Sequence, residues 1–440
     1  MVSDTLTNIE GWRNVKLGEL GEVARGRSRH RPRYAEHLYG GPYPFIQTGD
    51  VKASEGRINS HKQTYSEAGL AQSKLWPTKT LCITIAANIA ETGILKYPSC
   101  FPDSIIGFIA DEKKCDVYFI EYMFRFLRRQ IQYEATGSVQ DNINLQTLER
   151  LEFLLPPLPE QKAIAHVLGT LDDRIELNRR MNATLEAMAQ ALFKSWFVDF
   201  DPVMDNALAN GKEIPEELSE KAQARAALGD KRRPLPEEIR TLFPDEFTFS
   251  EALGWIPKVW EENQIGDLLE LAYGKSLPAK KREPGLYPVY GSGGIGGYHK
   301  EAIVIGPGII VGRKGTIGSV YWENGDFFPI DTVFFVKPKT ELPMYWFYQN
   351  LNNMDIASLG ADSAVPGVNR NAVYFKKWIV PNTAILEKYW NIISDLVKKR
   401  QALGCHNEIL EKLRDTLLPK LLSGELRIPD AEKMIERADG

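Results

Sequence analysis

The sequence has no long apolar run. No stretch of about 18 or more apolar residues occurs among its 440 residues, which excludes a transmembrane helix of ordinary length. The N-terminal segment also lacks the basic, then apolar, then small-residue pattern of a secretory signal. We therefore expect a soluble protein of the cytoplasm that has no membrane partner.

Cysteine is scarce. The four cysteines, Cys82, Cys100, Cys115 and Cys405, are too few and too irregularly spaced for a disulfide framework or a zinc site. We expect four reduced thiols and no bound metal.

Positive charge is not in excess. There are 54 Lys and Arg against 58 Asp and Glu, which gives a formal net charge of −4. This balance argues against a chain that coats nucleic acid indiscriminately. Any binding of nucleic acid must use local basic surfaces or be shared with a partner. The hydrophobic fraction of 43% is that of a globular protein, and the length favours two to three domains.

Motifs for catalysis and cofactor binding are incomplete. Gly291, Gly293 and Gly296 have the spacing of a dinucleotide-binding loop, but the residues after them predict a strand instead of the required helix. The carboxylates of Asp103 and Glu112 resemble part of a metal-dependent nuclease site, yet the second half of the chain does not repeat the pattern. We therefore expect no catalytic residue and no cofactor in this chain.

What the sequence does contain is a duplication. Trp12, Gly18 and Gly26 recur at one constant offset as Trp260, Gly266 and Gly274, and at a second offset Ser138, Asn144 and Pro156 recur as Ser363, Asn369 and Pro381. Solenoids stack many short repeats, whereas here there are only two long ones. The pattern therefore indicates a duplicated domain.

Each copy consists of a globular block followed by a long amphipathic helix. Short apolar runs such as Ile105–Ala110 predict strands, and Val117–Tyr133 has helical spacing, so the blocks belong to the mixed α/β class. Pro156, Pro157 and Pro159 predict a stiff hinge before the first long helix. The expected boundaries are a first domain at 1–157, a long helix at 158–200, a linker with short helices at 201–255, a second domain at 256–382, a second long helix at 383–426 and a frayed tail at 427–440.

Apolar residues recur along both long helices at close to heptad spacing, and each stripe must be buried on another helix. The economical partner is the helix of the other copy, which predicts a coiled coil. The predicted interface residues are Ile164, Val167, Leu171, Leu185, Met188, Leu192, Tyr389, Ile392, Leu396, Leu403, Leu410, Leu413 and Leu417. Polar residues interrupt the stripes at Arg174, Asn178, Lys399 and His406, and these either fix the register or face solvent.

Arginines alternate along one segment of the first domain. Arg25, Arg27, Arg29, Arg31 and Arg33 fall within nine positions, and the matching segment of the second copy carries Lys275, Lys280, Lys281 and Arg282. Arginine suits both guanine edges and phosphates, so we predict two DNA-contacting loops. Weaker candidates in predicted loops are Asn142, Arg313, Lys314, Asn369 and Arg370. The alternatives are solvated basic loops, and asparagines that cap turns.

Four segments carry a family resemblance. They are LPPLPEQ at 155–161, LFKSWFVDFDPV at 192–203, LGWIPKVW at 253–260 and LRDTLLPKLLSGELRI at 413–428. Together with the duplication, they make the whole chain resemble the specificity subunit of type I restriction-modification enzymes. The resemblance implies two target-recognition domains and two long helices that pair antiparallel as a spacer, with pseudo-two-fold symmetry. One departure is that the entry to the second helix reads PNTAIL at 381–386, where the first helix has a PPLPEQ segment.

The resemblance also implies a function in prokaryotic defence. The chain would read double-stranded DNA at two half-sites separated by an unread spacer, much as dimer geometry sets half-site separation elsewhere. Two modification subunits would carry S-adenosylmethionine and methylate a flipped adenine. Restriction subunits would supply the nuclease and the translocase, with ATP and magnesium. Two alternatives stay open, namely a coiled-coil scaffold without a DNA role and a metal-dependent nuclease using Asp103 and Glu112.

Overall fold

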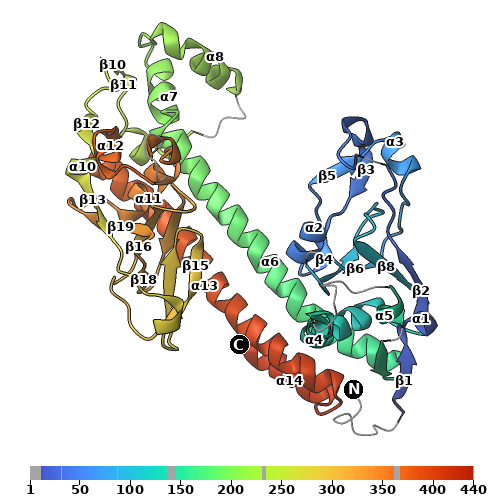
Figure 1. Ribbon diagram of the computed structural model, residues 1–440. Helices are drawn as coiled ribbons and strands as arrows, with labels where there is room; N and C mark the ends of the chain where they lie inside the picture. The colour runs from blue at the N-terminus through green and yellow to red at the C-terminus, as the bar shows by residue number, and fades with distance from the viewer. Residues whose placement is uncertain are drawn as a thin grey trace. The chain divides into compact units, whose positions relative to one another are not determined.

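The computed structural model describes residues 11–30, 32–86, 88–136, 145–149, 151–229, 234–360 and 367–439 (Figure 1). The chain divides into two compact units. Unit 1 contains Met1–Asn178 and Cys405–Gly440, and unit 2 contains Arg179–Gly404. Each unit therefore combines one globular domain with part of each long helix.

The domain of unit 1 is built on a five-stranded sheet. Its strand order is β2 (Gly21–Arg25), β8 (Ile105–Ala110), β6 (Leu81–Thr84), β7 (Thr92–Leu95) and β4 (Gly56–Ile58), with only β4 and β7 parallel. Helix α4 (Val117–Thr136) contacts β7. A smaller sheet pairs β3 (Tyr39–Phe45) with β5 (Gln63–Tyr65), and β1 (Arg13–Lys16) pairs with β9 (Glu152–Leu155). Short helices complete the domain: α1 (Leu17–Leu20), η1 (Glu36–Leu38), α2 (Thr48–Ala53), α3 (Glu67–Ala71) and α5 (Leu145–Glu149).

Both faces of this sheet are buried. Leu81 and Ile83 belong to the core that contains α4, whereas Cys82 belongs to a second core with Trp76 and Phe101. Successive residues of a strand point to opposite faces, so an uninterrupted apolar run is what a sheet covered on both sides requires. The stack of Trp76 on Phe101, with ring centroids 4.7 Å apart, supports the loops beside β8.

The domain of unit 2 has a four-stranded sheet in the order β13 (Leu269–Tyr273), β19 (Val333–Pro338), β16 (Gly308–Gly312) and β17 (Val320–Glu323). Helix α11 (Met344–Asn352) packs on it. A second sheet is formed by β15 (Gly294–His299), β14 (Tyr287–Gly291) and β18 (Phe328–Pro329), and β12 (Glu261–Gln264) pairs with β20 (Lys377–Val380). Its short helices are α10 (Ile265–Leu268), η4 (Ala279–Lys281), η5 (Ala357–Gly360) and α12 (Arg370–Tyr374).

The two domains repeat one framework. The Gly26 N–H donates to the Ile105 carbonyl at 2.8 Å, and the Gly274 N–H donates to the Val333 carbonyl at 3.2 Å. A Cβ atom on Gly26 or Gly274 would lie 2.2 or 2.1 Å from a backbone oxygen of the facing loop. No side chain fits there, which explains why both copies have glycine at this position.

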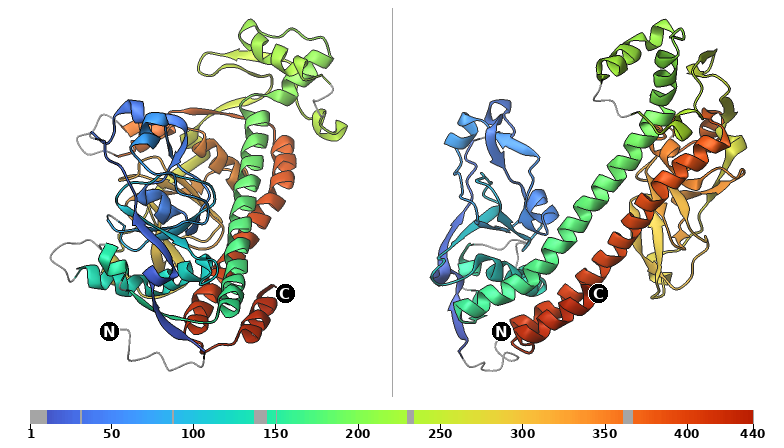
Figure 2. Two further views of the ribbon diagram at one scale, coloured as in Figure 1. Left: turned by 90° about the vertical axis from the view of Figure 1, so that its right-hand side faces the viewer. Right: turned by 180° about the vertical axis from the view of Figure 1, so that it is seen from behind.

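Helices α6 (Leu158–Phe197) and α13 (Thr383–Leu422) are each 40 residues long and run antiparallel (Figure 2). In unit 1, Asp172 and Asn178 of α6 contact Arg414 and Asn407 of α13. Of the predicted interface residues, six are buried and five are partly buried. The buried ones are Ile164, Val167, Leu171, Tyr389, Leu410 and Leu417, and the partly buried ones are Leu185, Leu192, Leu396, Leu403 and Leu413.

The prediction is wrong at Met188 and Ile392. Both side chains are exposed, and their neighbours Ala189 and Ile393 are fully buried instead. An α-helix has 3.6 residues per turn and a heptad assumes 3.5, so a stripe assigned by heptads drifts away from the real contact face. The two errors lie where the helices also pack against the second domain.

Each domain is attached to the helices by a carboxylate, an arginine and a tyrosine. In unit 1, Asp172 accepts hydrogen bonds from the Tyr122 hydroxyl at 2.6 Å and from Arg125 at 3.1 Å, both on α4. In unit 2, Glu186 of α6 pairs with Arg400 of α13, and Arg400 donates to the Tyr345 hydroxyl at 3.2 Å.

The linker contains α7 (Asp201–Ala209), η2 (Glu216–Leu218), α8 (Ser219–Ala227), α9 (Glu237–Arg240) and the hairpin β10 (Phe247–Ser250) and β11 (Gly254–Pro257). The C-terminal residues are not a frayed tail, because Ile428–Asp439 forms helix α14. Ala431 and Ile435 lie one turn apart and are both buried in the core of unit 1. No helix in the described part of the chain is long and apolar enough to cross a membrane.

Candidate nucleic-acid interface

Asp103 organises the arginines of unit 1. Arg33 donates from Nη2 to both carboxylate oxygens of Asp103, at 2.9 and 3.0 Å, and Arg25 donates from Nε to the Asp103 backbone carbonyl. Both members of the ion pair are solvent-exposed, so the pair contributes little to stability. The pair holds the Nη2 end of the Arg33 guanidinium against both carboxylate oxygens and so restricts where this cation points.

The backbone between these arginines is also held in place. The Arg27 carbonyl accepts from the Ser73 hydroxyl at 2.8 Å, and the Arg29 N–H donates to Gln72 Oε1 at 2.6 Å. The side chains of Arg27 and Arg29 themselves are exposed. The segment therefore presents cations to solvent from a backbone that is hydrogen-bonded to the two residues that follow α3. Two predicted residues, Arg31 and Asn142, lie outside the described residues.

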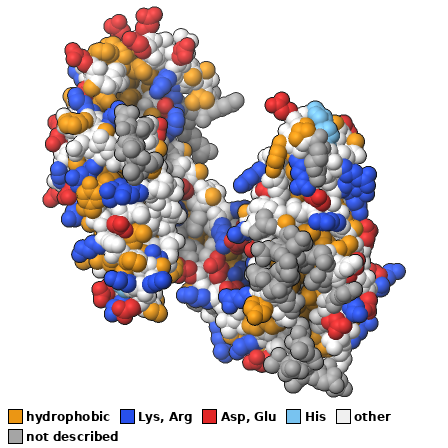
Figure 3. All heavy atoms as spheres, in the orientation of Figure 1, with side chains coloured by type: hydrophobic (Ala, Val, Ile, Leu, Met, Phe, Trp, Pro, Cys, Tyr) orange, Lys and Arg blue, Asp and Glu red, His pale blue; other side chains and the backbone are white. Residues whose placement is uncertain are grey.

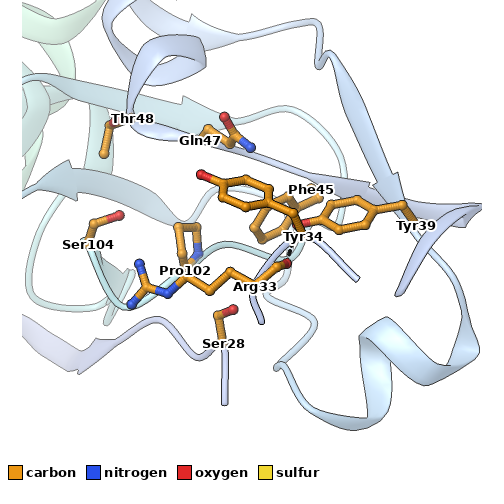
Figure 4. A pocket seen from close by; sticks show the side chains of 9 residues that line it. All are labelled: Ser28, Arg33, Tyr34, Tyr39, Phe45, Gln47, Thr48, Pro102 and Ser104. Carbon is orange, nitrogen blue, oxygen red and sulfur yellow. Dashed lines mark hydrogen bonds between the residues drawn. The ribbon is translucent and has the colours of Figure 1, made fainter. Parts of the chain in front are cut away.

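A pocket of about 150 Å³ lies beside this segment (Figure 4). Its lining residues are Ser28, Arg33, Tyr34, Tyr39, Phe45, Gln47, Thr48, Pro102 and Ser104. Small-molecule sites usually measure roughly 300 Å³ or more, so this pocket is too small for a cofactor such as a dinucleotide. Its amide, hydroxyl and guanidinium groups next to tyrosine rings are instead the groups that contact base edges and stack on bases.

Two interactions shape the pocket. The Tyr39 hydroxyl donates to the Arg33 carbonyl at 2.9 Å, and burial, followed by the nearby Tyr65, raises the pKa of Tyr39 to about 12. Tyr39 therefore stays a neutral donor at physiological pH. Gln47 Nε2 donates to Gln63 Oε1 at 2.7 Å, which fixes the Gln47 amide. Tyr34 at the pocket edge is 78% exposed.

In unit 2 the corresponding place is occupied by Tyr273, which the duplication aligns with Arg25. The guanidinium carbons of Arg313 and Arg370 lie 4.8 and 5.0 Å from the centroid of the Tyr273 ring. Arg313 also donates to the Asp331 carbonyl at 3.2 Å. Both domains thus place an arginine on the carbonyl of the equivalent aspartate, from β2 in unit 1 and from the residue after β16 in unit 2.

The remaining predicted residues of unit 2 differ in their surroundings. Lys275, Lys280, Lys281 and Lys314 are exposed. Arg282 is partly buried and donates to the Leu277 and Gly296 carbonyls, so it braces its own loop. Asn369 is the N-cap of α12, because its Oδ1 accepts from the backbone N–H groups of Asn371 and Ala372 at 3.1 and 3.3 Å. This is the capping role that the sequence had left open for asparagines.

Sequence reasoning missed Tyr273, Gln47 and the anchoring role of Asp103. The alignment of Tyr273 with Arg25 was the available signal, since an aromatic residue among basic loops suits stacking. The two carboxylates of the nuclease hypothesis have different partners, and Asp103 pairs with Arg33. Glu112 pairs with Lys79 at 2.8 Å, which lowers the pKa of Glu112. No group of three or more His, Cys, Asp and Glu that could hold a metal occurs among the described residues.

Comparison with known proteins identifies the family. The family model for the type I restriction modification DNA specificity domain matches residues 9–187 and 257–412. The chain belongs to this family. The two matched ranges include both globular domains and most of both long helices, so each copy of the duplication is one specificity domain. As a specificity subunit, the chain reads a DNA target for a type I restriction-modification system and has no catalytic role of its own.

Relatives with similar sequences cover most of the chain. The type I restriction enzyme HindI specificity subunit of Haemophilus influenzae is 25% identical over 72% of this chain and 80% of its own length. The MjaIX specificity subunit of Methanocaldococcus jannaschii is 24% identical over 95% of this chain and 94% of its own. The crystal structure of the type I restriction-modification S subunit from M. genitalium has the same fold, with a TM-score of 0.56 at 18% identity over 95% of this chain and 98% of that one.

Proposed function

We propose that the two specificity domains read two different half-sites of one double-stranded DNA target, separated by a spacer whose bases are not read. The observation that carries this proposal is that the two domains share one backbone framework but have different side chains at equivalent positions. The equivalent glycines Gly26 and Gly274 make the same backbone contact, yet beside them Arg25 stands in one domain and Tyr273 in the other. A shared framework places both loops alike on DNA, and different side chains read different bases.

The chain does not bind DNA through charge alone. Its net charge is −4, and on the face shown in Figure 3 blue and red side chains are interspersed over both units. A protein that neutralises many phosphates needs a cationic surface. We therefore propose that two modification subunits complete the DNA-binding surface and methylate adenine with S-adenosylmethionine. Restriction subunits would add ATP-dependent translocation and magnesium-dependent cleavage, and the assembly would work in the cytoplasm, where its DNA is.

The test is a map of N6-methyladenine in cells that express the chain with its modification subunit, compared with cells that lack the chain. The expected result is a split motif with two defined halves and an unread gap, which disappears when the chain is deleted. Methylation that does not change on deletion, with the modification subunit present and active, would contradict the proposal.

A further inference from the structure

Two buried amides meet between the long helices in unit 1. Asn178 of α6 and Asn407 of α13 are each 8% exposed. Asn178 Nδ2 donates to Asn407 Oδ1 at 2.8 Å, and Asn407 Nδ2 donates to the Ile175 carbonyl at 3.3 Å. The surrounding side chains include Ile175 and Leu410, which are buried. A buried polar pair is costly unless its hydrogen bonds are made, and they are made in the observed alignment of the helices, where Asn178 Nδ2 also lies 3.4 Å from His406 Nδ1.

The other polar contacts between the helices agree with this alignment. On one side of the amide pair Asp172 contacts Arg414 at 2.9 Å, and in unit 2 Glu186 pairs with Arg400. Arg414, Asn407 and Arg400 recur every seven residues along α13 and therefore occupy one heptad position. A slip of one heptad would bring Asn407 level with Leu171 or Leu185, where no amide is available.

The duplication does not repeat the pair. The positions equivalent to Asn407 and Asn178 are Asn182 and Leu403. Asn182 Oδ1 is buried and has no hydrogen-bond partner among the described residues. An amide pair therefore forms at one of the two equivalent places, and a leucine stands where the second pair would need its other amide.

We propose that the Asn178–Asn407 pair locks the axial register of α6 against α13 and thereby fixes the length of the DNA spacer that the protein accepts. The inference rests on the proposed bipartite target. Both helices are continuous and pass from one compact unit into the other, so their alignment is the part of the chain that can determine spacing. A slip of one heptad shifts a helix by about 10 Å, which matches about three base pairs of DNA.

The experiment uses the full chain produced with its modification subunit. In the double variant Asn178→Leu with Asn407→Leu, both amides are removed together, so neither is left buried and unpaired. A buried polar pair of this kind lowers the stability of a coiled coil but specifies its register. We therefore expect the double variant to have an unchanged or higher melting temperature of the complex. At the same time, methylation at sites whose spacer differs by one to about three base pairs should rise at least about tenfold. A tenfold change in an equilibrium constant corresponds to about 1.4 kcal/mol, which is close to the contribution of one buried amide hydrogen bond.

Two further variants separate a register role from a general packing role. Leu410→Met, a volume-conserving change in the same seam, should leave spacer selectivity as it is. Adding Leu403→Asn to the double variant gives Asn182 an amide partner and should restore selectivity. If the leucine variant does not assemble, Asn178→Ala with Asn407→Ala removes the same hydrogen bonds without added bulk.

The outcomes are distinguishable. Both half-sites kept with a broadened spacer would support the lock. Both half-sites and the spacer kept unchanged in the double variant would overturn it while leaving the proposed function intact. A wild-type chain that directs no split motif at all would contradict the proposed function itself.

Discussion

Asp103 fixes Arg33 by two hydrogen bonds at the edge of the unit 1 pocket, so this guanidinium is oriented before DNA arrives. We expect Arg33→Ala to cost about 1–3 kcal/mol of binding free energy and to relax base preference at one position of a single half-site. The measurement is binding of the assembled methyltransferase to duplexes varied one base pair at a time. Arg13→Ala, an exposed arginine on β1, is the matched control. An equal loss on every sequence would show that Arg33 contacts phosphate instead of a base.

Tyr273 provides a complementary test in unit 2, because its ring lies against two arginines. Tyr273→Ala removes the surface that orients Arg313 and Arg370, and we expect it to weaken binding by about 1–2 kcal/mol through the half-site that Arg33 does not affect. Tyr273→Phe keeps the ring and should stay close to wild type. If both substitutions weaken binding equally, the hydroxyl is the important group and the stacking argument is wrong.

At the scale of elements, Asp172 joins α6 to both α4 and α13. Burial would raise the pKa of Asp172, but Arg125, Tyr122 and Arg414 outweigh it and hold the pKa below the ordinary value of 3.8. The stabilisation by this carboxylate is therefore fully present above pH 3.8 and is lost only as the pH falls through the lower folded-state pKa.

Replacing this carboxylate should loosen the attachment of α4 at neutral pH. We expect Asp172→Asn to lower the free energy of local opening by about 1–3 kcal/mol, because Arg125 keeps Glu121 and Arg414 keeps Asp415, so each arginine loses one of its two carboxylate partners. Hydrogen–deuterium exchange of α4 and α6 in the assembled complex measures this quantity. Asp173→Asn is the matched control, since Asp173 is 69% exposed and its ion pair with Arg57 should contribute less than about 1 kcal/mol. Equal effects of the two substitutions would contradict the buried-cluster argument.

The elements show which features the sequence could predict. Prolines and a long apolar stripe are signals that a short stretch of sequence carries by itself. Helix α6 begins at Leu158 and α13 at Thr383, which are the starts expected from the sequence. Helix α14 was missed although Ile428, Ala431 and Ile435 have the i, i+3, i+7 spacing of one helical face and pack in the core of unit 1. The pocket was missed because no local signal marks it. Tyr39 and Gln47 are far from Pro102 in sequence, and the three converge only when β3 and the residues before β8 fold together.

At the scale of the whole molecule, the duplication predicts independent reading. Replacing residues 1–157 by the equivalent domain of a relative with a different target should change one half of the methylated motif and leave the other half and the spacer as they are. Methylation mapping in cells provides the measurement, and the exchange of residues 256–382 is the reciprocal control. A change in both halves would mean that the domains do not read DNA independently.

The order of the two units along the chain affects how the protein can fold during synthesis. Unit 2 is one continuous stretch of chain, whereas unit 1 is completed only by residues 405–440. During translation the first domain leaves the ribosome early, yet Leu410, Leu417 and Leu421, which belong to its core, are made last. At roughly 5–20 residues per second the apolar surface of α6 in unit 1 stays uncovered for on the order of tens of seconds. The unit that is translated later is thus the first that can finish folding, and a message cut short before residue 405 yields a chain whose first domain never closes its core.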